Sequence, residues 1–173
     1  MPNMDRRAFA TRSTALAALA AVGLAPALHA APTNQADELR SRFLLDLSLD
    51  ARQPSQIGAT STGRLIVPVA GGTFDGPRLK GTVLPPAGDW ITERADGSRV
   101  LDVRALLRTD DGELIYISWR GIAYTPPGGT LFARIVPVFE AASAKYSWLN
   151  NLVAVGVYRP SAGNVAYRVY EIL

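Results

Sequence analysis

Cysteine is absent from the 173-residue sequence, and histidine occurs once, at His29. Beyond residue 30 the chain therefore offers no disulfide, no thiolate nucleophile, no imidazole base, and no cysteine or histidine ligand for a metal. These absences exclude zinc–cysteine sites and the hydrolases that depend on a cysteine or a histidine. We accordingly expect no metal site and no cofactor.

A large excess of one charge is also missing. The 18 basic and 15 acidic residues give a net charge of +3. Residues 1–30 hold three of the basic residues and one of the acids, so the rest of the chain has 15 against 14, a net charge of +1. Binding to a phosphate backbone needs clustered positive charge, and we expect no nucleic-acid partner.

Residues 1–30 have the organisation of an export signal. Arg6-Arg7-Ala8-Phe9 resembles the twin-arginine motif, and an uncharged run rich in alanine and leucine follows over residues 14–28. This run is shorter than the ~20 residues that cross a bilayer as a helix, so we expect no stable membrane anchor. Small residues favour cleavage after Ala27 or Ala30, which predicts a periplasmic or secreted protein. General secretion, or an alanine-rich helix that is retained, are the alternatives.

The chain after a polar lead-in at residues 31–41 has the pattern of an all-β domain. Short runs rich in valine, isoleucine, leucine and aromatic residues alternate with glycine, proline and aspartate clusters. The predicted strands are 42–50, 63–70, 77–84, 99–109, 113–123, 132–140, 151–159 and 164–172. Links of hairpin length favour a single antiparallel up-and-down barrel of about eight strands over residues 42–173. Such a barrel is either filled by side chains or roomy enough for one small ligand.

Several motifs occur in order along this domain. They are VPVAGGTF (67–74), GPRLKG (76–81), GDW (88–90), LRTDDG (107–112), YSWLN (146–150) and YEIL (170–173). Together they resemble a bacterial family of small β-barrels known as DUF3237 or UPF0311. The resemblance implies one barrel domain, and it brings no established activity and no catalytic residues.

Two neighbouring predicted strands each have one polar face. Asp102 and Arg104 share a face of strand 99–109, and Tyr116 lies on the polar face of strand 113–123. A hairpin at residues 110–112 would place position 106 opposite 116, so that the three groups can converge. In one interpretation these faces are the solvated exterior, as in most half-buried strands. In the other they line the lumen as a polar patch.

Aromatic and amide side chains near predicted strand ends are further candidates for a ligand site. Asp89-Trp90 follows a Pro-Pro-Ala-Gly segment, and Trp148 and Asn150 lie in the segment before the seventh predicted strand. Glu140 ends a strand face that mixes polar and apolar residues. The two tryptophans could equally cap the core with their indole groups bonded to main-chain carbonyls.

These features leave three functions open. The first is an exported barrel that binds a small, partly apolar molecule in its lumen between Trp90, Tyr116 and Trp148. The second is a cofactor-free isomerase, cyclase or lyase, with Asp102 or Asp89 as acid or base, Tyr116 as proton donor and Arg104 stabilising negative charge. The third is a filled barrel that acts as a non-catalytic interaction module in the envelope. Oligomeric state is left open.

The export signal can be tested with the arginine pair. Replacing Arg6 and Arg7 together by lysine should stop export if the twin-arginine route is used, because that route reads the pair. The measurement is the amount of protein in a periplasmic fraction. Undiminished accumulation would rule this route out in favour of general secretion.

Overall fold

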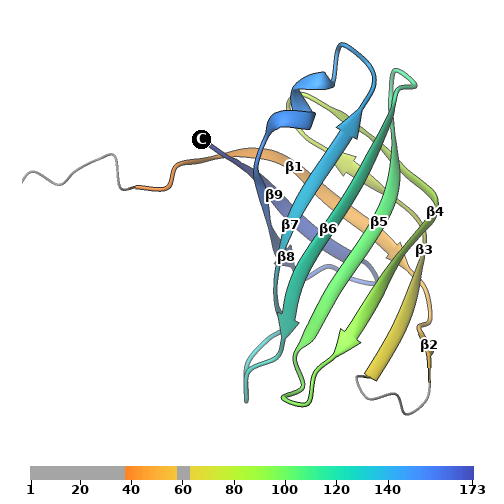
Figure 1. Cartoon of the computed structure of the whole chain (residues 1–173), viewed down its shortest axis with the longest axis vertical. Coiled ribbons are helices and arrows are strands. Elements are labelled where there is room, and N and C mark those ends of the chain that lie inside the picture. Colours follow the sequence, from red (N-terminus) through yellow and green to blue (C-terminus); the bar gives the residue numbers. More distant parts are fainter. Residues whose placement is uncertain (1–37, 58–62) are drawn as a thin grey trace, which may run out of the picture. The chain divides into compact units, whose positions relative to one another are not determined.

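A computed structural model describes residues 38–57 and 63–173. The predicted signal at residues 1–30, and residues 31–37 of the predicted lead-in, lie outside the described residues. The described chain folds as one antiparallel β-barrel (Figure 1). In this part of the chain no helix is long and apolar enough to span a membrane.

The described residues form eight long strands and one short one. They are β1 (Ser41–Ala51), β2 (Ser55–Gln56), β3 (Gly63–Asp75), β4 (Lys80–Glu93), β5 (Arg99–Thr109), β6 (Leu114–Tyr124), β7 (Phe132–Ala141), β8 (Ala154–Arg159) and β9 (Val165–Ile172). A short 3-10 helix, η2 (Ser147–Asn151), lies between β7 and β8.

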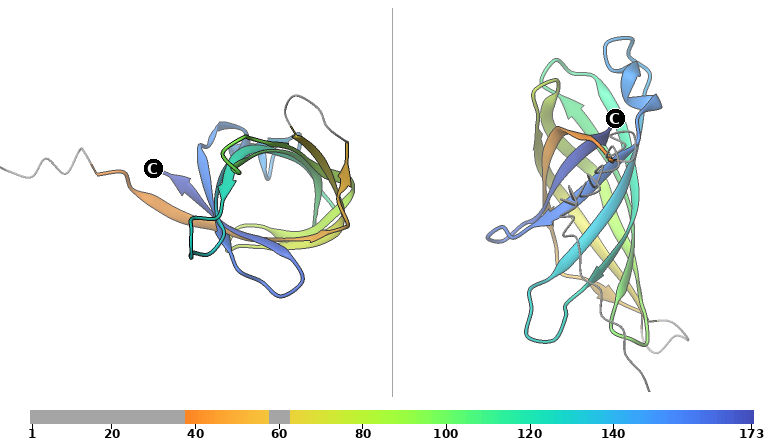
Figure 2. Two further views of the ribbon diagram at one scale, coloured as in Figure 1. Left: turned by 90° about the horizontal axis from the view of Figure 1, so that it is seen from below. Right: turned by 90° about the vertical axis from the view of Figure 1, so that its left-hand side faces the viewer.

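The sheet closes on itself because β1 is hydrogen-bonded on both of its edges. Consecutive long strands are neighbours from β3 to β9, and β1 pairs with β9 on one side and with β3 on the other. The end-on view shows the resulting ring of strands (Figure 2). The predicted all-β, up-and-down, eight-stranded barrel is confirmed, as is the predicted register of Leu106 opposite Tyr116.

Two strands are longer than predicted because irregular residues lie within them. Gly71-Gly72, which lies between two predicted strands, belongs to β3, and Pro85-Pro86 belongs to β4. Between β3 and β4 the register shifts from Val69 opposite Ala87 to Gly72 opposite Val83. Such a β-bulge changes which residues of a strand face inward.

Side chains alternate between an apolar lumen and a more polar exterior. In β5 the buried positions are Leu101, Val103, Ala105, Leu107 and Thr109, and the residues between them are partly or fully exposed. This period of two is what a half-buried strand requires.

The half of the lumen next to η2, uppermost in Figure 1, is densely filled. Phe74, Leu107 and Phe139 are each at most 2% exposed there, and Tyr146 and Leu149 from the η2 segment are also buried. We call this half the packed half.

The wall is least regular between β7 and β8. In the described sheet these strands pair only at Arg134 and Ile135, opposite Val157 and Gly156. The far end of β7 is held instead by Asn150. Its side-chain Oδ1 accepts from the Ala141 N–H at 2.7 Å, and its Nδ2 donates to the Ala141 carbonyl at 2.9 Å.

A substitution at Gly72 tests whether the close approach of β1 and β3 contributes to stability. Its φ is +148°, and a Cβ there would lie 2.1 Å from the Ser48 carbonyl oxygen, so Gly72→Ala cannot be accommodated without moving the strand. Gly97→Ala is the matched control, since Gly97 has a φ of +80° but nothing within 4 Å of a Cβ. By urea unfolding we expect Gly97→Ala to lose about 1 kcal/mol and Gly72→Ala clearly more. Equal losses would contradict a steric role for the close approach.

Candidate functional site

A cavity of about 240 Å³ occupies the half of the lumen away from η2. It is lined by the ends of strands that meet near the β4–β5 and β6–β7 links, at the lower end in Figure 1, and by residues beside the β8–β9 link. Exposed Arg99 and Leu131 are among the lining residues, so the cavity reaches the surface there. Most of the other lining side chains are aliphatic.

This half is hollow because small residues occupy its inward positions. Ala51, Ala123 and Ala133 line the cavity, where the packed half has phenylalanine, leucine and isoleucine. A barrel of this size is filled only if its inward side chains are large enough. The sequence therefore builds a lumen that is filled by large side chains near η2 and hollow in the other half.

Asp89 is the one carboxylate among the described residues that line the cavity. Its Oδ1 accepts a hydrogen bond from the main-chain N–H of Asp102 at 3.0 Å. Burial raises the pKa of Asp89 from 3.8 to about 6, the Asp102 hydrogen bond opposes this rise, and the nearby Asp102 charge adds to it. A carboxyl with this pKa exchanges its proton close to neutral pH.

Three aromatic residues form one wall of the cavity. The ring of Tyr167 meets the ring of Trp119 edge to face at 6.2 Å between centroids and that of Tyr158 at 6.0 Å. Burial, together with the charges of Asp89 and Tyr158, raises the pKa of Tyr167 above its ordinary value. Tyr167 therefore keeps its proton at physiological pH and is a hydrogen-bond donor rather than a base.

Trp119 carries an unsatisfied donor. Its side chain is 2% exposed and lines the cavity, and its buried Nε1 has no hydrogen-bond partner within the described part of the protein. Leaving a buried donor unpaired costs about 1–3 kcal/mol. Native proteins leave few such groups, and an orphaned one calls for an explanation.

An ion pair lies at the rim of the cavity. Arg99 begins β5 opposite Glu93 at the end of β4, and its Nε and Nη2 donate to Glu93 Oε1 at 3.2 and 3.0 Å. Arg99 is the one cationic residue among the described residues that line the cavity. Because Glu93 engages its guanidinium, Arg99 adds little free positive charge.

Asp102, Arg104 and Tyr116 lie on the outer face of the barrel. Their strands alternate so that Val103 and Ile117 face inward, and the three candidates are left partly or fully exposed. Arg104 Nη1 lies 3.3 Å from Asp102 Oδ1. The placement of these residues in the lumen was therefore wrong. The alternative, in which the polar faces are the exterior, describes the structure.

The two predicted tryptophans also lie away from the cavity. Trp90 is 38% exposed within β4, with the Arg104 guanidinium 5.6 Å from its ring centroid, rather than in a loop at the barrel mouth. Trp148 belongs to η2 at the opposite end of the barrel, where the Arg78 guanidinium lies 3.6 Å from its ring centroid.

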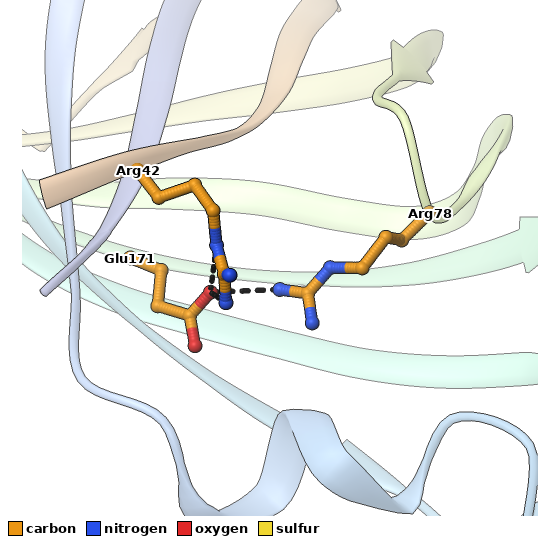
Figure 3. A network of polar contacts seen from close by, with 3 residues as sticks. All are labelled: Arg42, Arg78 and Glu171. Carbon is orange, nitrogen blue, oxygen red and sulfur yellow. Dashed lines mark hydrogen bonds and ion pairs between the residues drawn. The ribbon is translucent and has the colours of Figure 1, made fainter. Parts of the chain in front are cut away.

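Arg78 belongs to a charge network at that end of the barrel. Arg78 and Arg42 each donate to Glu171 Oε2 at 2.8 Å (Figure 3). The two guanidiniums hold the pKa of Glu171 below its ordinary value. The network joins β1, β9 and the β3–β4 link and fixes the surroundings of Trp148.

The remaining candidates meet in a shallow groove on the outer surface. Tyr116 lies opposite Glu140 across the β6–β7 pair, and Asn150 lines the same groove while its amide holds the end of β7. The structure thus brings these three together outside the barrel. Of all the predicted site residues, Asp89 alone lines the lumenal cavity.

Sequence reasoning missed Trp119, Tyr158 and Tyr167. Trp119 lies on the apolar face of β6, and alternation along one strand does not distinguish a core face from a cavity wall. The alanines at inward positions near one end of the strands were the signal that could have separated a hollow half from a filled one. Within the described residues, no three histidine, cysteine, aspartate or glutamate side chains gather in a group that could hold a metal ion.

The raised pKa of Asp89 makes a stability prediction. The folded state favours the neutral carboxyl. The contribution of this carboxyl to the free energy of unfolding is therefore fully present below pH 4. It is lost as pH rises through about 6, and the loss is about 3 kcal/mol. Asp89→Asn cannot ionise but keeps an acceptor for the Asp102 N–H. By urea unfolding, this variant should gain stability relative to the wild type between pH 4 and pH 7. Asp102→Asn, on the outer face, is the control, and a similar gain there would contradict the assignment to Asp89.

Comparison with known proteins agrees with the barrel. The family model described as "Protein of unknown function (DUF3237)" matches residues 39–172. A UPF0311 protein of Clostridium acetobutylicum is 29% identical over 151 residues, covering 78% of this chain and 95% of that protein. The crystal structure of a β-barrel-like protein from Acinetobacter baumannii has 33% identity and a TM-score of 0.74, covering 79% of this chain and 97% of that one.

A fungal enzyme is also similar to part of the chain. A hydroalkoxylation enzyme of Penicillium herquei is 33% identical over 97 residues, which cover 56% of this chain and 53% of the enzyme. The closed barrel and the family match, which spans nearly all of the described residues, lead to the same conclusion: this chain belongs to the DUF3237 (UPF0311) family of uncharacterised β-barrel proteins.

Proposed function

We propose that the barrel binds a small, largely apolar molecule in its lumenal cavity and that Asp89 exchanges a proton with it. The observation that carries this proposal is a carboxyl with a pKa of about 6, the one carboxyl among the described residues that line a largely apolar cavity. General acids and bases work best when their pKa lies near the operating pH. Among the described residues, Asp89 accepts from the Asp102 N–H, and the cation that lines the cavity, Arg99, is engaged by Glu93 rather than by Asp89.

The cavity limits the size of the molecule. An apolar cavity of ~150 Å³ holds one benzene molecule, and pockets for drug-sized ligands begin at roughly 300 Å³. The 240 Å³ found here suits a molecule of about two fused rings. The cavity also argues against the filled barrel that an interaction module would use.

The chemistry that such a site supports is cofactor-free proton transfer. Protonated Asp89 can donate to a carbon or oxygen of the substrate, and ionised Asp89 can accept a proton, which suffices for an isomerase, cyclase or lyase. The similarity to a hydroalkoxylation enzyme supports this class. Addition of an alcohol O–H across a double bond needs a proton delivered to carbon and one removed from oxygen.

Binding without turnover is the second candidate. It is favoured by the scarcity of other proton-transfer groups, because the raised pKa of Tyr167 keeps that hydroxyl protonated and Arg99 is engaged by Glu93. For either function we also propose that the protein is exported, as its first thirty residues predict.

The Kemp elimination of 5-nitrobenzisoxazole tests Asp89 as a base. This uncharged bicyclic probe loses its ring C–H proton to a base while the N–O bond breaks, giving a coloured cyanophenolate. We expect the full chain to catalyse this reaction with kcat/KM rising to a plateau around a midpoint of about pH 6. Asp89→Asn should lose at least about 100-fold, which is the size of a typical acid–base contribution.

Asp102→Asn is the matched control, because Asp102 is the neighbouring carboxylate on the outer face. It should retain the activity, with a midpoint slightly below that of the wild type because the Asp102 charge no longer raises the pKa of Asp89. Equal turnover by the wild type and Asp89→Asn would contradict the role of Asp89 as a base. Saturable binding of the probe without turnover would instead favour the carrier function.

A further inference from the structure

Trp119 lines the cavity, and its indole N–H is a buried donor without an acceptor among the described residues. Trp119 is 2% exposed, and no described group accepts a hydrogen bond from its Nε1. Phenylalanine would supply an aromatic wall at this position without the unpaired donor. A molecule in the cavity that offers an acceptor would relieve the free-energy cost of burying this group.

We propose that Trp119 determines the specificity of the lumenal site by donating a hydrogen bond to a carbonyl-type oxygen of an uncharged, flat molecule of about two rings. This inference rests on the proposed function, since it assumes that the cavity holds a ligand. It adds the chemical class of that ligand and a residue that selects it.

The register places Trp119 and Asp89 at a distance that such a ligand can span. Asp89 lies opposite Val103 across the β4–β5 pair, and Val103 lies opposite Trp119 across the β5–β6 pair. The three residues form one row, and all three line the cavity. Strands in a sheet are about 4.8 Å apart, so the ends of the row are roughly 10 Å apart along the wall. A two-ring molecule can therefore meet the indole at one end while its reacting position faces Asp89.

The charges around the cavity favour an uncharged molecule. Asp89 repels an anion when it is ionised, and the guanidinium of Arg99 is already engaged by Glu93. A simple ammonium ion has no lone pair to accept from Trp119. A neutral ketone, aldehyde or lactone has an acceptor for the indole and introduces no charge into the apolar chamber.

The aromatic wall favours a flat molecule. The ring of Tyr167 packs edge to face with both Trp119 and Tyr158, at 65° and 73° between planes. Rings prefer to meet further rings in such edge-to-face or offset arrangements. A planar ligand can extend this arrangement into the cavity.

Two probes of equal shape test the hydrogen bond. 1-Indanone and 1-methyleneindane are both bicyclic and uncharged, and they differ in an oxygen against a methylene group. We expect the full wild-type chain to bind indanone about tenfold more tightly by isothermal titration calorimetry, a ratio within the range of one net hydrogen bond. In Trp119→Phe the ratio should fall to about one, mainly because indanone binds less tightly.

Trp90→Phe is the matched control, because Trp90 lies on the outer face of the barrel. It should keep the tenfold ratio. Equal affinity of the wild type for both probes, or a ratio that survives in Trp119→Phe, would overturn the role of Trp119 while leaving lumenal binding intact. If neither probe binds the wild type, the proposed function fails as well. Should Trp119→Phe not fold, Tyr167→Phe decides instead, because it removes the neighbouring hydroxyl donor, and loss of the tenfold ratio in this variant would overturn the role of Trp119.

Discussion

Hydrogen bonding of β1 on both edges is the constraint on which the rest of the structure depends. By pairing with β9 and with β3, this strand turns an open sheet into a barrel without free edges along most of its wall. Closure gives all inward side chains one shared lumen. Any inward polar group is then separated from bulk water, which is why a single inward aspartate has a raised pKa.

The lumen has two halves because inward side chains differ in size along the strands. Phenylalanine and leucine fill the half near η2, and alanine at positions 51, 123 and 133 leaves room in the other. Asp89 is held at the wall of the hollow half by the main-chain N–H of Asp102, whose own side chain faces outward. A main-chain donor fixes the carboxyl in place without a cation that would lower its pKa strongly.

The sequence allowed the fold to be predicted well and the site only in part. Regular alternation and hairpin links predicted eight antiparallel strands, and the turn at residues 110–112 predicted the β5–β6 register. The bulge at Gly71-Gly72 and the prolines within β4 were not foreseen, because glycine and proline usually mark strand ends. Without these irregularities the inward direction of Asp89 and the outward direction of Trp90 could not be derived.

The lumen assignment failed for a different reason. Asp102, Arg104 and Tyr116 attracted attention because polar groups carry chemistry, yet the solvated face of a barrel is where most polar groups belong. Tyr158 and Tyr167 lie opposite each other through the β8–β9 register, and the ring of Trp119 on β6 meets the ring of Tyr167 on β9. Contacts of this kind arise because the barrel closes. The residue pattern within a single strand does not reveal them.

The short pairing between β7 and β8 has a consequence for motion. Where a wall lacks a continuous ladder, local opening costs less free energy and amide protons exchange faster with solvent. Beside Ala141 the two hydrogen bonds that a neighbouring strand would make are made by the side chain of Asn150. This position is at the end of the barrel that large side chains fill. Local opening of the sheet is therefore expected away from the chamber that contains Asp89 and Trp119. The β5–β6 and β6–β7 pairs beside the chamber have unbroken ladders, so local opening is expected first at the β7–β8 seam next to Ala141.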